Sequence, residues 1–125
     1  MKIIITPEKL IKDIQDEFSS AFPFLRVEFF KKSTPKTRDM VHKISNLLPL
    51  GNVDKVTGSK EVVVSPLMTV KDFENDFETQ FGMGVHLYRK SGNSWLEITI
   101  TDRWTMKQQD DRGNEISMIV DRYVY

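Results

Sequence analysis

Side chains that commonly carry out catalysis are sparse in this 125-residue chain, which has no cysteine and two histidines. His42 and His86 fall on different predicted elements, and Asp39, three residues before His42, forms a single weak pair with it. The phosphate-loop, dinucleotide-binding, serine-hydrolase and zinc-protease motifs are all missing from the sequence. We therefore expect no metal site, no cofactor and no enzyme activity.

An unrecognised catalytic cleft remains an alternative. Glu97, Asp102 and Arg103 lie near the end of a predicted β-hairpin, and His86 lies in its first strand. Four acidic residues alternate along a predicted helix, so they spread around its polar side instead of converging as an acid and a base. We interpret these four as a solvated helix face: Asp72, Glu74, Asp76 and Glu78.

Aromatic side chains give the most informative pattern. Alternation in the predicted strands 24–31, 85–90 and 94–101 sends rings and charges to the face opposite the core. Rings among cations can stack the bases of single-stranded nucleic acid, or can bind a protein. In the alternative interpretation, helix 35–48 or the C-terminal segment covers this face. The outward residues are Arg26, Glu28, Phe30, His86, Tyr88, Lys90 and Trp95.

A basic stretch follows the 24–31 strand, and Asp39 is its only acidic residue. Such a stretch could contact an anion or nucleic acid, although a solvated helix face is the alternative. The whole chain balances 18 basic against 18 acidic residues, which excludes a generally polybasic role. The basic residues are Lys31, Lys32, Lys36, Arg38 and Lys43.

The length and the 39% hydrophobic content suit a single domain over residues 1–125, with an irregular insertion at 32–59 that contains a helix near 35–48. The start of the chain lacks a secretory signal and no apolar run approaches a membrane span, so we expect a cytoplasmic protein with no membrane partner. No internal repeat is visible.

The periodicity of hydrophobic residues, together with helix-capping and helix-ending residues, predicts the order of elements. Strands are predicted at 3–5, 24–31, 60–65, 85–90 and 94–101, the first of them buried on both faces. Helices are predicted from Pro7, capped by Thr6, and over 70–81, capped by Thr69 and closed by Gly82. A short helix follows Thr105 and ends near Gly113, and the tail 115–125 favours helix.

These elements predict an α+β fold with a two-layer mixed sheet and helices. The nearest template is a ferredoxin-like core with an added C-terminal hairpin strand and a short helix.

The segment 81–97, FGMGVHLYRKSGNSWLE, followed by TDRWT at 101–105, resembles a segment shared by a group of small uncharacterised bacterial proteins. The resemblance covers roughly the C-terminal third of the chain and the strand near Phe24–Phe30. It implies no activity, but it singles out the Arg89 to Trp95 hairpin, where turn geometry does not explain Arg89 and Lys90.

The sequence thus predicts a non-enzymatic binding or adaptor domain that takes a protein partner, or a second copy, around Phe30, Tyr88 and Trp95. The alternative is a single-stranded nucleic-acid binder that uses the same face together with the basic stretch.

Overall fold

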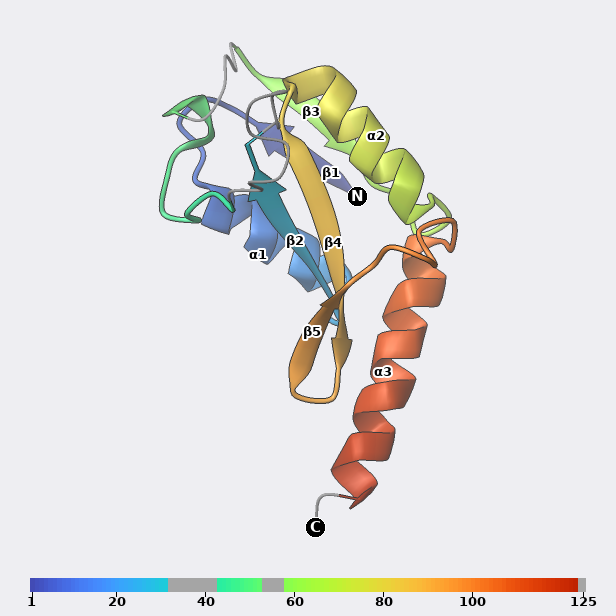
Figure 1. Cartoon of the computed structure of the whole chain (residues 1–125). Helices are drawn as coiled ribbons and strands as arrows, with labels where there is room; N and C mark the ends of the chain where they lie inside the picture. Colours follow the sequence, from blue (N-terminus) through green and yellow to red (C-terminus); the bar gives the residue numbers. More distant parts are fainter. Residues whose placement is uncertain (32–42, 53–57, 124–125) are drawn as a thin grey trace, which may run out of the picture.

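The computed structural model describes residues 1–31, 43–52 and 58–123 (Figure 1). In chain order its elements are β1 (Lys2–Ile5), α1 (Ile11–Ala21), β2 (Leu25–Phe30), the short 3-10 helix η1 (Leu50–Asn52), β3 (Lys60–Val63), α2 (Val70–Phe81), β4 (Gly84–Ser91), β5 (Ser94–Glu97) and α3 (Met106–Tyr123).

The described strands form two antiparallel sheets, which confirms the α+β class. β1 pairs with β3, while β4 lies between β2 and β5 in a three-stranded sheet. The prediction of a mixed sheet is therefore wrong. The ferredoxin-like core is not confirmed, since such a core joins its strands in a single sheet.

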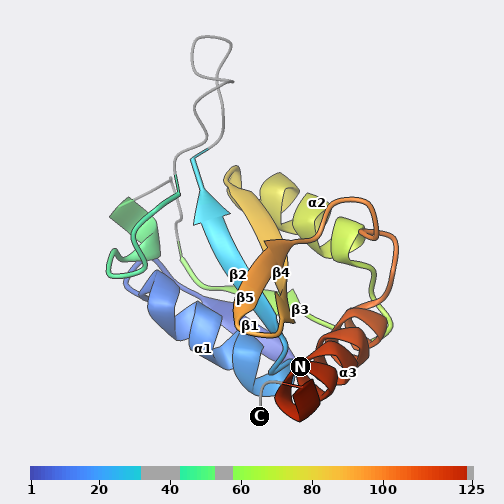
Figure 2. The ribbon, with the colours of Figure 1, turned by 60° about the horizontal axis from the view of Figure 1, so that its bottom comes forward.

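One face of the three-stranded sheet, which we call the inner face, carries the core. Leu25, Val27 and Phe29 alternate inward as predicted and are buried, as are Val85 and Leu87 of β4. They belong to one hydrophobic cluster with the buried sides of α1, α2 and the β1–β3 pair. Figures 1 and 2 show the helices on this side of the sheet, which leaves the opposite, outward face for the candidate site.

The capping signals at Thr69 and Thr105 are confirmed. The Asp72 N–H donates to Thr69 Oγ1 (3.1 Å), and α2 closes at Gly82 with a left-handed φ of 72°. At the start of α3, the Gln108 N–H donates to Thr105 Oγ1 (3.1 Å) and the Thr105 N–H donates to Gln108 Oε1 (2.9 Å). This reciprocal pair satisfies two N–H groups that a helix start leaves free.

The hairpin is also confirmed, with a two-residue turn in which Gly92 has a φ of 63°. However, β5 ends at Glu97, short of the predicted 94–101. The Ile98 N–H still donates to Leu87 O (2.9 Å), after which the chain leaves the sheet and Ile100 is 95% exposed. Alternation within 94–101 predicts that Ile100 points inward, so its exposure contradicts that prediction.

The first strand is not buried on both faces. Ile3 and Ile5 are buried, but Ile4 is 40% exposed, and Val63 on the paired strand is 56% exposed. The two-stranded sheet buries one side in the core and leaves the other to solvent, as antiparallel sheets commonly do.

Helix α1 begins at Ile11 and not at Pro7. Its first two N–H groups donate to the backbone carbonyls of Leu48 (3.1 Å) and Asn46 (2.9 Å). Because this distant segment satisfies the helix start, the Thr6 cap is not used, and the prediction of the boundary is wrong.

The helix expected near 35–48 is not found in its described part. Residues 43–48 are extended or turn-like, with Lys43 bridged to Phe30 and Leu47 exposed. Residues 32–42, which hold the rest of that prediction, lie outside the described residues. The extended backbone is explained by its contacts, since 43–46 runs along the edge of β2.

Helix α3 continues through Gly113 to Tyr123, so the predicted short helix is wrong and the helical tail is confirmed to that residue. Gly113 serves a close approach and not a helix end. A Cβ built there would lie 2.7 Å from Phe24 Cβ and 3.3 Å from Arg89 Cγ.

We expect Gly113→Ala to lower the free energy of unfolding by about 1–2 kcal/mol, because overpacking outweighs the gain in helix propensity. Denaturant unfolding measures this effect. Asn114→Ala, at the next and exposed position of the same helix, should leave stability nearly unchanged or slightly raised. Equal stabilisation by both substitutions would contradict the close packing.

An approximate internal two-fold axis relates β1–α1–β2 to β3–α2–β4, so the expectation of no repeat is wrong. The equivalent residues Ile3 and Val62 pair with each other at the centre of one sheet. In the other sheet Val27 pairs with Leu87, its equivalent once one additional residue between α2 and β4 is allowed for. The helix starts of α2 and α3 exchange backbone hydrogen bonds as α1 and η1 do. Identical pairs in equivalent positions are Pro7 and Pro66, Lys12 and Lys71, Asp13 and Asp72, Phe18 and Phe77, and Phe22 and Phe81.

Candidate functional site

The outward face of β2, β4 and β5 brings together most of the predicted binding residues. Arg26 lies beside Tyr88 across the β2–β4 pair, and Tyr88 lies beside Glu97 across the hairpin. Lys90 and Trp95 form the neighbouring cross-strand pair. Among the described elements no helix lies over this face (Figures 1 and 2).

Phe30 differs from the prediction, since it lies on this face but is only 8% exposed. Its ring packs edge-on against His86, with the ring centroids 4.9 Å apart. Tyr88 and Trp95 are partly buried. The predicted open platform of the rings of Phe30, His86, Tyr88 and Trp95 is therefore not observed, and Phe30 is not free to stack a base.

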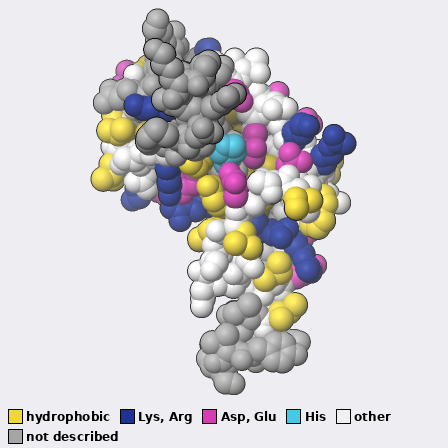
Figure 3. Space-filling view, in the orientation of Figure 1, with side chains coloured by type: hydrophobic (Ala, Val, Ile, Leu, Met, Phe, Trp, Pro, Cys, Tyr) yellow, Lys and Arg dark blue, Asp and Glu magenta, His cyan; other side chains and the backbone are white. Residues whose placement is uncertain are grey.

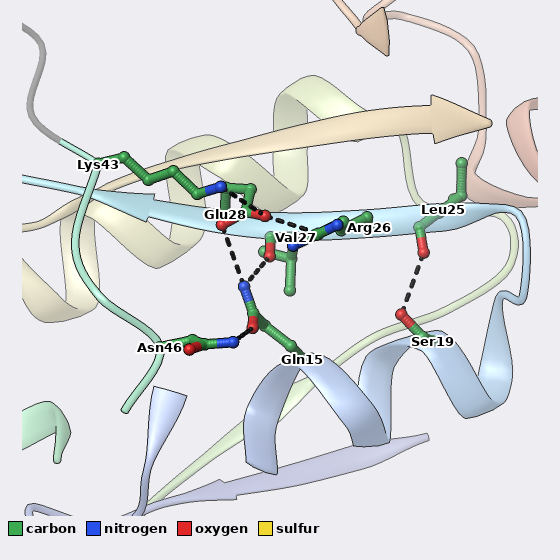
Figure 4. A network of polar contacts seen from close by, with 8 residues as sticks. All are labelled: Gln15, Ser19, Leu25, Arg26, Val27, Glu28, Lys43 and Asn46. Carbon is green, nitrogen blue, oxygen red and sulfur yellow. Dashed lines mark hydrogen bonds and ion pairs between the residues drawn. The ribbon is translucent and has the colours of Figure 1, made fainter. Parts of the chain in front are cut away.

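A buried carboxylate organises the β2 side of the face (Figure 4). The Glu28 side chain is 5% exposed, and its Oε1 lies 2.6 Å from Arg26 Nε and 3.3 Å from Lys43 Nζ. Its Oε2 accepts from Gln15 Nε2 at 3.2 Å. These partners compensate a buried charge that would otherwise be costly. Sequence reasoning placed Glu28 on this face and missed Gln15, which follows a core position of α1.

Gln15 also helps to close the edge of β2. Figure 4 shows its amide and the Ser19 hydroxyl on two carbonyls of this strand, and the Ile44 N–H occupies a third, so donors at alternate positions block strand addition along this edge. Ser19 Oγ donates to Leu25 O (3.2 Å), Gln15 Nε2 donates to Val27 O (2.8 Å), and the Ile44 N–H donates to Phe29 O (2.8 Å).

Two adjoining hollows lie beside this edge. Each has a volume of about 410 Å³; the first is lined by Arg26, Glu28 and Lys43, and the second reaches Lys31. The structure thus places both ends of the predicted basic stretch, Lys31 and Lys43, at one site. Its other members, Lys32, Lys36 and Arg38, lie outside the described residues.

An acidic cluster occupies the opposite side of the face, around His86. The Nδ1 of His86 lies 3.8 Å from Glu74 Oε2 and 3.7 Å from Glu97 Oε1. Figure 3 shows acidic side chains gathered beside the histidine. Glu74 Oε1 also accepts from the Leu87 N–H at 3.4 Å. The prediction that Glu74 belongs to a solvated helix face is therefore wrong. The alternation along α2 gave no signal that this residue turns toward β4.

These neighbours raise the pKa of His86. The interaction with Glu74 is the largest cause, the charges of Glu97 and Glu78 add to it, and partial burial opposes it. Protonated His86 therefore forms ion pairs with carboxylates from α2 and β5.

This pKa shift makes stability depend on pH. Because the pKa of His86 is higher in the folded than in the unfolded chain, its contribution is fully present below about pH 6.5 and is lost as pH rises through the folded pKa. We expect the free energy of unfolding to fall across that range. Denaturant unfolding of the wild type and His86→Gln measures it, and an identical pH dependence in both would exclude this origin.

Arg89 does not lie on the outward face, contrary to the grouping predicted from the hairpin. It shares the inner side with Leu96 and turns toward α3, where its Nη1 donates to Gln109 Oε1 at 2.9 Å. Its guanidinium carbon lies 5.9 Å from the centre of the Trp104 ring. Burial and the charge of Arg112 lower the pKa of Arg89. A packing role thus explains Arg89.

No family model, curated protein or solved structure matches this chain. The resemblance of the hairpin segment therefore stays a prediction. In the described residues, no group of three or more histidine, cysteine, aspartate and glutamate side chains is arranged to hold a metal ion. No helix among them has the length and apolar character to cross a membrane.

Of the four residues named for an alternative catalytic cleft, Glu97 and His86 lie together as an ion pair, 3.7 Å apart, while Asp102 and Arg103 do not line the nearby hollow. A hollow of about 200 Å³ is lined by Arg89 and residues 96–101, including Glu97. It includes neither His86, which lies on the outward face, nor Asp102, whose carbonyl accepts from the start of α2.

Proposed function

We propose that this chain is a non-enzymatic binding domain that takes a protein partner on the outward face of β2, β4 and β5. One observation carries the proposal: the helices pack on the inner face, while the outward face presents partly buried rings between charged clusters. Partly buried aromatic side chains bordered by charges are typical of protein-binding surfaces.

Site-specific photo-crosslinking tests this proposal. A photoreactive phenylalanine analogue at Tyr88 should give a defined protein adduct in cells, whereas the same analogue at Lys107, an exposed position on α3, should not. Adducts that are equally abundant at both positions, or absent at Tyr88, would contradict the proposal.

A second candidate function is the binding of a polyanion, such as single-stranded nucleic acid. It is favoured by the hollows beside β2, which bring Arg26 together with Lys31 and Lys43, the two ends of the basic stretch. Oligonucleotide binding followed by fluorescence anisotropy should weaken with added salt and on Lys43→Ala. No anisotropy change at low salt would exclude this function.

A further inference from the structure

We propose that the partner on the outward face is a second copy of this chain, docked face to face about a two-fold axis parallel to β4. This inference rests on the proposed function, since it takes the outward face as the binding surface. It adds the identity of the partner, the symmetry and the pairing of residues.

The central row of the face has opposite charges at its two ends. Arg26 on β2, Tyr88 on β4 and Glu97 on β5 are direct cross-strand neighbours. Adjacent strands lie about 4.8 Å apart, so the two charges flank the ring at a separation of about 10 Å. The side chains of Arg26 and Glu97 are 41% and 42% exposed, so both can reach a partner.

A two-fold axis along β4 matches these ends. Rotation about this axis places Tyr88 of one chain near Tyr88 of the other. It also places the β2 side of each chain opposite the β5 side of its partner. Arg26 of one chain then meets Glu97 of the other, and the contact occurs twice because such an interface is isologous. Although Arg26 Nε is taken by Glu28, the guanidinium has further N–H donors.

The flanking clusters select the same axis. Lys31 and Lys43 lie on the β2 side, while Glu74 lies 3.8 Å from His86 on the other, with Glu78 one helical turn further along α2. Rotation about β4 places the cationic flank against the acidic one. An in-plane axis perpendicular to the strands would instead bring each flank against its own copy and repel it. Charge complementarity thus argues for a second copy and fixes its orientation.

The absence of cysteine from the sequence makes this arrangement directly testable. Facing sheets lie about 10 Å apart, so Tyr88→Cys should be joined to its own copy by a bismaleimide of about that span. The product should have twice the 14.6 kDa mass of one chain. Lys107→Cys, exposed on α3, should remain unlinked. Equal linking of both variants, or none at Tyr88→Cys, would overturn the arrangement.

Light scattering on the uncrosslinked chain supplies the second measurement. We expect a dimer whose dissociation constant rises about tenfold or more in Glu97→Lys, which opposes Arg26 twice, and rises less in Glu97→Gln. Circular dichroism of both variants confirms that they fold. A wild type that stays monomeric up to ~1 mM would overturn the second copy.

The two proposals fail separately. A Tyr88 photo-adduct with a different protein, formed by a monomeric chain, would overturn the second copy and leave the binding face intact. Absence of any adduct at Tyr88, together with a monomeric chain, would overturn both.

Discussion

Phe18→Ala and Phe77→Ala should each lower the free energy of unfolding by about 3–5 kcal/mol. Both rings are buried, at 0% and 2% exposure. Phe18 packs against Phe22 and Phe73, and Phe77 packs against Phe29, Phe73 and Phe81. Because the two positions are equivalent under the internal two-fold, each truncation leaves a comparable cavity between a helix and the inner face. We therefore expect similar losses.

Denaturant unfolding with an unchanged slope measures these losses. Ile100→Ala is the control, since Ile100 is 95% exposed and its truncation should change stability by less than about 0.5 kcal/mol. A loss below about 1 kcal/mol for one phenylalanine and a large loss for the other would show that the two halves do not share the core equally.

Several short-range signals correctly predicted where a helix begins or ends and where a hairpin turns. The Thr69 cap, the Gly82 helix end and the 92–93 turn depend on residues a few positions apart, and all are present. The prediction of one mixed sheet was wrong because the pairing of distant strands joins residues far apart in sequence. Nothing within Ile3–Ile5 indicates that its neighbour is the strand at 60–63.

The candidate face was predicted in part for the same reason. Alternation correctly sends Arg26, His86 and Tyr88 to one side of the sheet. Burial of Glu28 and Phe30 depends on 43–46, which packs against the edge of β2 although it is not adjacent to this strand in the sequence. No local pattern carries that information.

The repeat was missed because equivalent positions keep their character more often than their identity. Ile3, Ile4 and Ile5 correspond to valines at 62–64, and Thr6 corresponds to Ser65. A hydrophobic or hydroxyl residue satisfies the same packing or turn at each site, so few identical pairs remain. Strand register reveals the equivalence, since a residue and its copy face each other at the axis.

Gln109→Ala should lower the free energy of unfolding by about 3 kcal/mol. Gln109 has no exposed surface, accepts from Arg89 Nη1, and donates to the carbonyl (2.7 Å) and hydroxyl (2.9 Å) of Thr101. It therefore joins α3 to β4 and to the loop that follows β5. Truncation leaves the partly buried guanidinium of Arg89 without this acceptor. The loss is large because Arg89 Nε also has no hydrogen-bond partner among the described residues.

A double-mutant cycle separates this polar link from ordinary packing. Gln109→Met alone keeps the volume but leaves Arg89 without its acceptor, and Arg89→Met alone leaves Gln109 Oε1 without its donor. The two substitutions combined remove both polar groups. We expect the double variant to be more stable than Gln109→Met, because an unpaired buried polar group costs more than a missing pair. Losses that simply add would show that Arg89 and Gln109 do not depend on each other, and that the Trp104 contact and the helix cap hold α3 in place.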